Sequence, residues 1–559
     1  MNYTLEKLLS KSNKDSIKVN GLYLHSKYDP VREAQQIAKE NYSPHHLHII
    51  FGVGLGYIVN SLIEELNFNE PLLIIDPLID EGLINFEKNN YKYNKIYYGS
   101  VKDEPVLSNL LSQLGSYSNK VQVIIGHNYK ELFPKQLSRA LQLIRNSQIR
   151  EVYNLNTINL FSMQWQLNSF FNIGHMIGDY SLESIFNIYD VPVVIASGGP
   201  SLTKQINNLK KFRNKIILIC AGSTINSLLK NNISPDYVVT IDGGIANYNH
   251  FKDISLNNTD ILYAPTSHYK IRESFKRNGF VFINGGMRSL QGYFKNITND
   301  IFPIIPGGGS VAHYALSIAK RITSGPICLV GQDLAYTNQM THATGNLSAK
   351  NAKEVNKKLL KVEGYYNDIV ETNDSFNTMI DTFEQLQLAD PHRNTTYNCT
   401  EGGAKIKLFE QLPFEDFLKR YCKKNVEKYT IQNEKVRNFS FEKFTEEQFY
   451  SYQQIIKYLD KGIKITLKEN GPYFKTNTIA SLSKIDKKLN HFYTMHNLDT
   501  LLEPIIIKNE NKYLPKMDES KLEEFERVKD YTVELYSDCK KRLLEYTEYI
   551  KREIGEENE

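Results

Sequence analysis

A glycine-rich turn after an apolar run is the most specific chemical signal in the sequence. The segment IASGGPSLTKQI places small and hydroxyl residues between an expected strand and an expected helix, namely Ser197, Gly198, Gly199, Pro200 and Ser201. Proline is well accepted in a first helical turn, and the backbone N–H groups of a helix start bind anions. Taken alone, this turn fits a nucleotide phosphate and plain strand-to-helix packing equally well.

The expected strands that follow also end in small, polar or acidic residues. In an open parallel sheet the carboxyl ends of the strands share one edge, which is where ligands bind. The sequence therefore predicts a nucleotide-binding cleft at this edge. The residues at these strand ends are Ala221, Gly222 and Ser223, then Asp242, Gly243 and Gly244, then Asn284 and Gly285.

A second glycine turn, PGGGSVAHYALSIAKRI, precedes an amphipathic helix. Its backbone amides form another place that can cradle an anion. We expect Gly308, Gly309 and Ser310 to form this second anion site. His313 lies one turn inside the helix, and the burial tendency of histidine favours a packing role for it.

Polar residues are concentrated after the last apolar run, in GQDLAYTNQMTHATG. This segment brings Gln332, Asp333, Tyr336, Thr341 and His342 to the same edge within a short stretch. Such polar density at a strand end is more than a loop requires. Further along, NCTEGGAKI carries Glu401 in a turn that by itself reads as solvated but that could reach the cleft.

An earlier glycine cluster, FGVGLGY, follows an apolar strand and places Gly52, Gly54 and Gly56 before a helix. A dinucleotide site requires a third glycine where this chain has Tyr57. Asp76, at the end of the next strand, could hold a ribose. Because a lone glycine cluster is weak support for a ligand, we interpret this domain as structural.

The elements that position these residues form two α/β series and a helical tail. Buried apolar runs alternating with helices predict two Rossmann-like, doubly wound parallel sheets. The charged and amphipathic C-terminal sequence predicts an α-helical domain. The expected divisions are an N-terminal domain at 1–155, a helical connector at 156–190, a catalytic domain at 191–415 and a helical domain at 416–559.

The composition restricts the function class. The chain has 559 residues, 41% hydrophobic and 23% charged, and its net charge of +4 comes from 67 basic and 63 acidic residues without a long basic run, so nucleic acid is not favoured. The five cysteines lack metal-ligand spacing and read as reduced thiols. No signal peptide or membrane-length apolar run is present, which predicts a cytoplasmic protein without membrane insertion.

These segments in this order resemble the central domain of the motility-associated factor (Maf) flagellin glycosyltransferases. The motifs are ASGGPSL, VVTIDGG, GGGSVAHYALSIA, LVGQDLAY with THATG, and NCTEGGAKI. The resemblance extends to the FGVGLGY turn and to the helical segment around Trp165. That central domain is similar to bacterial sialyltransferases, whose phosphate turn resembles Gly198 to Ser201 and which use CMP-sialic acid.

The resemblance implies transfer of a nonulosonic acid, of the pseudaminic or legionaminic type, from CMP to serine or threonine hydroxyls of flagellin, a step needed for flagellum assembly and motility. It implies an inverting displacement with His342 as general base. The Tyr336 hydroxyl would stabilise the departing phosphate, and Glu401 is a second candidate for the base. Asp242 would contact the ribose or the cytosine, and Ser310 with its neighbouring amides would contact the donor phosphate. Asp333 would belong to the nucleotide site together with the two glycine turns.

No cofactor beyond the CMP-sugar donor is expected. A metal-bridged sugar nucleotide would require clustered carboxylates at a strand end, and the central segment has no DxD pair there, so we predict no required metal. The polar faces of the C-terminal helices read as solvated surface, with flagellin docking as the functional alternative. The oligomeric state stays open, a homo-oligomer included.

Two other functions remain. Archaeal hydroxymethylpterin diphosphokinases look similar in the same phosphate turn and strand-end aspartate, and such an enzyme would use ATP, Mg2+ and a pterin. A non-catalytic flagellin scaffold could keep an inert sugar-nucleotide fold, although the crowding of His342, Tyr336, Asp333 and Glu401 speaks against it.

Overall fold

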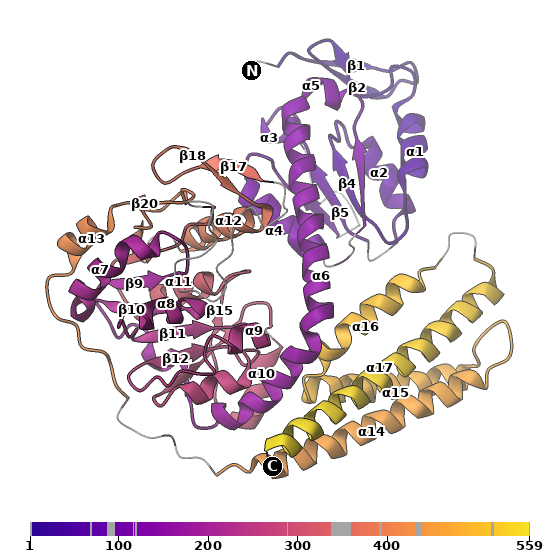
Figure 1. The fold of residues 1–559 in the computed structure, drawn as a ribbon. Coiled ribbons are helices and arrows are strands. Elements are labelled where there is room, and N and C mark those ends of the chain that lie inside the picture. Colours follow the sequence, from indigo (N-terminus) through magenta and orange to yellow (C-terminus); the bar gives the residue numbers. More distant parts are fainter. Residues whose placement is uncertain are drawn as a thin grey trace. The chain divides into compact units, whose positions relative to one another are not determined.

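The computed structural model describes residues 3–67, 70–85, 95–115, 117, 120–287, 289–336, 359–390, 394–431, 435, 438–515 and 519–557. They form two compact units, and the division falls between Leu160 and Phe161. This division lies inside one long helix, α6 (Pro134–Met176), which begins well before the helical connector predicted at 156–190. Each unit has its own sheet (Figure 1).

The first unit is built on a parallel sheet with the strand order β6-β5-β4-β7. Its central strands are apolar and completely buried, as expected for a parallel sheet covered on both faces. A small antiparallel sheet precedes it. The strands are β1 (Leu5–Leu9), β2 (Asp15–Val19), β3 (Leu22–Tyr23), β4 (Leu47–Phe51), β5 (Leu72–Ile75), β6 (Ile96–Tyr98) and β7 (Val121–Ile125); the helices are α1 (Pro30–Asn41), α2 (Tyr57–Glu65), α3 (Pro77–Asp80), α4 (Glu104–Gly115) and α5 (Tyr129–Leu132).

The second unit contains a nine-stranded parallel sheet with the order β20-β19-β16-β9-β10-β11-β12-β13-β8. The order runs in opposite directions from β9 and β16, so the topological switch point lies between these two strands. In such sheets the ligand crevice lies outside the carboxyl ends at this point. The strands are β8 (Tyr180–Ser181), β9 (Val193–Ala196), β10 (Ile217–Ala221), β11 (Tyr237–Thr240), β12 (Asp260–Tyr263), β13 (Gly279–Val281), β16 (Ile327–Val330), β19 (Thr396–Asn398) and β20 (Glu410–Gln411).

Helices cover both faces of this sheet. Successive side chains of a strand point to opposite faces, so alternate residues of each central strand enter two different hydrophobic cores. Val194 and Ala196 of β9 belong to one hydrophobic cluster, and Val193 and Ile195 belong to the other. The helices are α7 (Leu202–Phe212), α8 (Ile225–Leu229), α9 (Ile245–Tyr248), α10 (Leu290–Thr298), α11 (Val311–Ile322), α12 (Asp374–Ala389) and α13 (Phe414–Tyr421), with short 3-10 turns at η2 (Leu182–Ile185), η3 (Arg213–Lys215), η4 (Gly222–Thr224) and η5 (Tyr269–Ser274).

Two segments differ from the sequence prediction. The run FVFING, expected as one strand, divides into β13 and β14 (Ile283–Asn284), and β14 pairs with β15 (Ile304–Ile305) in a separate small sheet. The segment NCTEGGAKI, expected as a turn, begins inside β19, which pairs with β16. A hairpin of β17 (Leu360–Glu363) and β18 (Ile369–Thr372) precedes α12.

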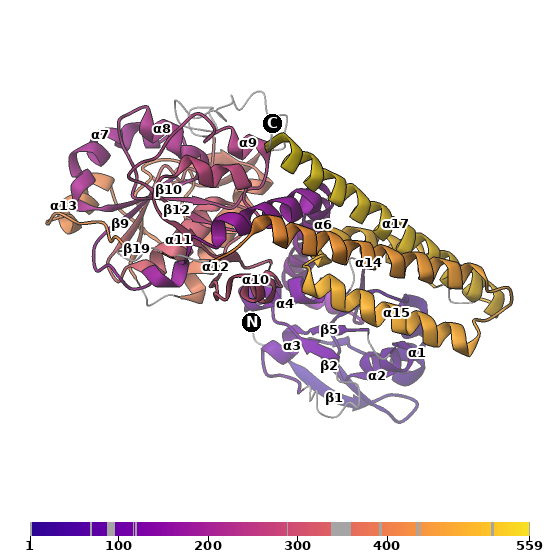
Figure 2. The same cartoon turned by 90° about the horizontal axis from the view of Figure 1, so that it is seen from below.

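The C-terminal part is helical, as predicted, and consists of α14 (Phe441–Leu467), α15 (Thr476–Met495), α16 (Asp499–Lys512) and α17 (Lys521–Glu557) (Figure 2). These helices share a hydrophobic cluster with one face of the nine-stranded sheet. Tyr546 of α17, for example, contacts Phe170 of α6 and Tyr452 of α14. The predicted fold class, two parallel α/β sheets followed by a helical region, is confirmed.

None of the helices that the structure describes is long and apolar enough to cross a membrane.

Candidate functional site at the carboxyl edge of the large sheet

The turns after β9, β16 and β19 are joined to one another at the switch point. The Ser197 hydroxyl donates to the side-chain oxygen of Gln332 at 2.6 Å. The backbone amide of Gly199 donates to the Gly331 carbonyl at 2.8 Å, and the backbone amide of Gln332 donates to the Thr400 hydroxyl at 3.2 Å. The edge that the sequence identifies as a ligand site is therefore one continuous, hydrogen-bonded surface.

Asp333 anchors the glycine turn that begins α7. Its side chain is 2% exposed, and one carboxylate oxygen accepts the Ser201 amide at 3.2 Å and the Ser201 hydroxyl at 2.6 Å. A Cβ on Gly199 would overlap this carboxylate. The anion position at the start of α7 is thus occupied by a carboxylate of the protein itself, and both Ser201 donors are used.

The backbone of Asp333 is held just as closely by the turn after β19. Its carbonyl accepts the Ala404 amide at 2.7 Å. Gly403 has a φ of +69°, and a Cβ there would overlap the Asp333 backbone. Only glycine fits this position, because the close approach and the left-handed backbone both exclude a side chain.

The second glycine turn remains open at its centre. Ser310 caps α11, and its hydroxyl oxygen accepts the Ala312 amide at 3.3 Å. Gly309 is exposed, and among the described residues no heavy atom would lie within 4 Å of a Cβ there, whereas a Cβ on Gly308 would meet Thr382 at 2.7 Å. Backbone at Gly309 can therefore be approached by a ligand.

Contacts of Val311 place this open turn beside the central strands. A Cβ on Gly222, which follows β10, would lie 3.7 Å from the Val311 side chain, and α11 packs across β9, β10 and β11. Gly307 lies against the ring of Tyr314. The expected pairing of this turn with the strand ends is present in the structure.

Asp242 follows β11 and is solvent-exposed, although protein surrounds its carboxylate on most sides. This setting raises the pKa of Asp242, because desolvation disfavours the charged form. Burial, and then the nearby charge of Asp242, raise the pKa of Tyr314 to about 12. Gly307, the ring of Tyr314 and the charge of Asp242 therefore lie near one another at the carboxyl edge.

Tyr336 and Glu401 make contacts with helix starts. The Tyr336 hydroxyl accepts a hydrogen bond from the Asn373 amide at 2.6 Å, where Asn373 caps α12. The Glu401 carboxylate accepts the Phe414 amide at the start of α13 at 3.0 Å, and it accepts the Gln205 amide at 3.3 Å. Thr341 and His342, which the sequence nominates, lie outside the described residues.

His313 is a packing residue, as the sequence favours. It is completely buried in α11, its ring lies 4.4 Å from that of Phe383, and one ring nitrogen contacts the Met379 carbonyl at 3.0 Å. Burial lowers the pKa of His313 to about 4, so the imidazole is neutral.

The glycine turn of the first unit is filled by side chains. Asp76 accepts the Val53 amide at 2.7 Å, the Leu78 amide at 2.8 Å and the Tyr129 hydroxyl at 2.8 Å. A Cβ on Gly54 would lie 2.5 Å from the imidazole of His25. Because the carboxylate that could bind a ribose is used internally, the geometry agrees with a structural reading of this turn.

Sequence reasoning did not identify three residues near the edge: Asn168 and Asn172 of α6, and His268 after β12. Each asparagine donates to loop carbonyls at the carboxyl edge. The signal in the sequence is a pair of asparagines four residues apart, Asn168 and Asn172, in the segment NSFFNIG. Such spacing places both on one face of a helix.

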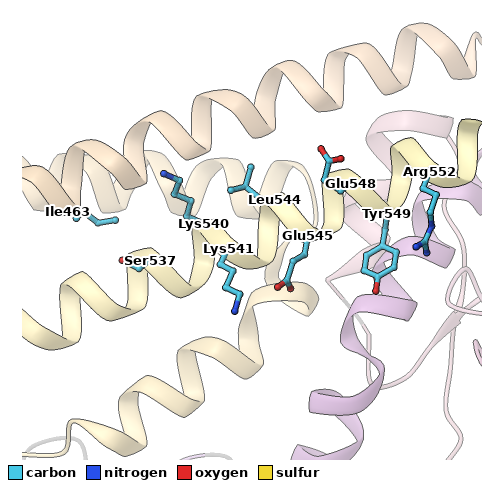
Figure 3. Close-up of a pocket in the computed structure, with 9 residues that line it drawn as sticks. All are labelled: Ile463, Ser537, Lys540, Lys541, Leu544, Glu545, Glu548, Tyr549 and Arg552. Carbon is cyan, nitrogen blue, oxygen red and sulfur yellow. The ribbon is translucent and has the colours of Figure 1, made fainter.

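A separate hollow of about 880 Å³ lies along α17, away from the sheet edge (Figure 3). Apolar and charged side chains alternate around it. The residues that line it are Ile463, Ser537, Lys540, Lys541, Leu544, Glu545, Glu548, Tyr549 and Arg552. Across the described ranges, no group of three or more His, Cys, Asp or Glu side chains is placed to hold a metal ion.

Comparisons with known proteins find similarity to a family model and to a solved structure. A family model described as 6-hydroxymethylpterin diphosphokinase MptE-like matches residues 168–339. No curated protein sequence matches the chain. The solved structure of a Maf glycosyltransferase from Magnetospirillum magneticum AMB-1 superposes with a TM-score of 0.59 at 13% identity, covering 98% of this chain and 93% of that chain. At this identity the likeness shows the fold, and the resemblance to Maf that the motifs predict is confirmed at that level.

Proposed function

We propose that the protein is a glycosyltransferase that moves a nonulosonic acid from its CMP donor to serine or threonine hydroxyls of flagellin in the cytoplasm. The observation that carries this proposal is the open Gly309 turn at the carboxyl edge of the sheet, where Asp242 follows β11, in a fold shared with a Maf glycosyltransferase over nearly the whole chain. An open amide turn suits the donor phosphate, and a carboxylate at the same edge suits ribose or cytosine hydrogen-bond donors.

In the proposed reaction the acceptor hydroxyl attacks the anomeric carbon, the bond to the CMP oxygen breaks, and the configuration inverts. His342 takes the proton of the attacking hydroxyl. The Tyr336 hydroxyl already accepts from Asn373, so its own proton is available to the departing phosphate. Glu401, whose carboxylate receives the first amide of α13, is the second candidate for the base.

The deciding experiment is intact-mass analysis of flagellin coexpressed with this protein and a nonulosonic acid pathway. We expect an added mass of one or more sugar residues, and His342→Ala should reduce the modified fraction at least about 100-fold, since loss of a general base costs roughly that much. Unmodified flagellin with the wild-type enzyme and a verified CMP-sugar pool would remove the proposal.

We further propose transfer without a metal. Purified enzyme with CMP-sugar and flagellin should keep its rate in EDTA. Loss of the rate in EDTA, followed by recovery with Mg2+, would contradict this part and leave the donor and acceptor unchanged.

A second candidate is a pterin diphosphokinase-like reaction, favoured by the family model that matches residues 168–339. Such an enzyme would use ATP, a hydroxymethylpterin and Mg2+, and would release AMP. The two candidates separate in one assay: release of CMP from CMP-sugar with flagellin supports the first, and pterin-dependent release of AMP supports the second.

For the acceptor we propose a docking surface on the C-terminal helices, at the hollow along α17. Leu544 and Tyr549 are 43% and 41% exposed there, beside Lys541 and Arg552. A protein acceptor requires contact area beyond the nucleotide cleft. Leu544→Glu should weaken flagellin binding at least about fivefold and leave CMP affinity unchanged, and equal flagellin binding would refute the assignment. A single substitution is the suitable test, because these helices share a core with the sheet and their deletion would disturb the fold.

A further inference from the structure

Two buried asparagines of α6 each hold two backbone carbonyls at the carboxyl edge. The Asn168 amide donates to the carbonyls of Gly243 at 3.1 Å and Thr266 at 3.0 Å. The Asn172 amide donates to the carbonyls of Pro265 at 2.7 Å and Ser267 at 2.8 Å. Both side chains are almost completely buried. One helical face therefore ties the loop after β11 to the loop after β12.

These loops carry the polar groups of the candidate site. Gly243 directly follows Asp242, and Ser267 directly precedes His268, whose amide donates to the Asp242 carbonyl at 3.3 Å. The His268 ring stacks on that of Tyr248, with 4.7 Å between centroids and 10° between planes. A change in either loop would therefore shift Asp242 and His268 together.

Trp165 lies one turn before Asn168 on the same helix. A Cβ on Gly243 would lie 3.3 Å from the Trp165 ring and 2.5 Å from the Asn168 amide nitrogen. The helix thus approaches the strand-end loop so closely that only glycine fits after Asp242. Trp165 is partly exposed and lies beside Gly243, the residue that follows Asp242.

We propose that Asn168 and Asn172 are positioning residues of the nucleotide site: they hold the loops after β11 and β12 in the geometry in which Asp242 and His268 meet the donor nucleotide. This inference rests on the proposed function. An amide side chain is suited to the task because it has two donor protons, and each one here satisfies a carbonyl of a loop. Without the amide, buried carbonyls lose their partners and the loops move to find others.

The chain offers a matched control at the opposite edge of the same sheet. The Asn394 amide donates to the carbonyls of Thr323 at 2.9 Å and Gly325 at 2.8 Å, just before β16 begins, and Asn394 is 6% exposed. Asn394→Ser removes one of two donors from a buried bidentate amide, as Asn168→Ser and Asn172→Ser do. The serine variants keep one hydroxyl donor, so they are milder than leucine variants and are expected to fold.

The experiment measures two quantities for each full-length variant: the Tm, and the Kd for CMP by titration calorimetry. We expect Asn168→Ser and Asn172→Ser to raise the CMP Kd about tenfold or more, with comparable decreases in Tm for all three variants and a Kd within twofold of wild type for Asn394→Ser. The fluorescence of Trp165, the single tryptophan of the chain, should change when CMP binds to the wild-type protein.

The outcomes separate the inference from the function on which it rests. If all three variants lose stability and none changes the Kd, the asparagines are structural and the inference is wrong. If the wild-type protein binds ATP and not CMP, the proposed donor is wrong, and the same comparison with ATP decides the inference. If the wild-type protein binds neither nucleotide, both the inference and the proposed function are wrong.

Discussion

Asp242 is a carboxylate that is exposed and yet poorly solvated. Its raised pKa means that the folded protein favours the protonated form, so ionisation of Asp242 opposes folding. Stability from this group is present at pH values below its unfolded pKa and is lost as pH rises through the raised, folded-state pKa. A charge kept at this cost to stability is typical of a ligand-binding position.

Asp242→Asn should therefore raise the free energy of unfolding at pH 7, by less than about 1 kcal/mol because solvent screens this exposed group. The Tm should rise slightly. The difference should shrink as pH falls through the raised pKa and should vanish only well below the unfolded-chain pKa of about 3.9, where the wild-type carboxyl is neutral in both states. Thermal denaturation between pH 4 and 8 measures it. A variant that is less stable than wild type at pH 7 would contradict the assigned environment.

Asp333 differs from Asp242, because groups of the protein bind its carboxylate. Its carboxylate is buried, and it accepts two hydrogen bonds from Ser201. Hydrogen bonds to a charged acceptor are stronger than those between neutral groups, which gives this residue a reason to be retained without any ligand. A strand-end aspartate can thus serve binding or architecture, and its partners decide which.

At the scale of elements, three glycine turns similar in sequence differ in what fills them. His25 and Tyr129 fill the turn after β4, and Asp333 occupies the anion position after β9. Only the turn before α11 offers open space, at Gly309. Local sequence predicts the turn and its free amides, but the occupant comes from a distant part of the chain.

Gly309→Val tests the open turn. The new side chain meets no protein atom near its Cβ, so we expect a Tm within about 2 °C of wild type, while the donor KM rises at least about tenfold because the branched side chain fills ligand space. Gly308→Ala is the contrasting variant: its Cβ would meet Thr382 at 2.7 Å, so it should lose stability. An unchanged donor KM in Gly309→Val would show that this turn does not face the donor.

At the scale of the whole molecule, the helical tail is part of the architecture of the second unit. Tyr546 of α17 is completely buried between Phe170 of α6 and Tyr452 of α14. These three aromatic residues lie far apart in sequence but belong to the cluster that also covers one face of the nine-stranded sheet. Loss of packing in the helical tail should therefore also destabilise the nine-stranded sheet.

Tyr546→Ala should lower the free energy of unfolding by about 3 to 5 kcal/mol, the usual cost of removing a buried aromatic side chain. The unfolding midpoint measured by circular dichroism, which reports helix loss, and the midpoint measured by Trp165 fluorescence should both shift to the same lower denaturant concentration. Leu522→Ala on the same helix is the control: Leu522 is 52% exposed and should change stability by less than about 0.5 kcal/mol. Separate transitions for the two probes would mean that tail and sheet unfold independently.

The sequence by itself determined the α/β class, the parallel strands, the helical tail and the edge at which ligands would bind. These features follow from apolar periodicity and from glycine and proline positions, which act locally. Gly198 to Ser201, Asp242, Gly309 and Asp333 could be placed at that edge, because the carboxyl ends of parallel strands meet there.

Only the tertiary structure decided which of these residues are free to meet a ligand. It assigned Ser201 to Asp333, Asp76 to its own glycine turn and Glu401 to the start of α13, and among the described residues it left Gly309 open. It also brought Asn168 and Asn172 to the strand-end loops, nearly one hundred residues away in sequence. Hydrogen-bond partners are chosen by proximity in space after folding, and local residue patterns carry no record of that choice.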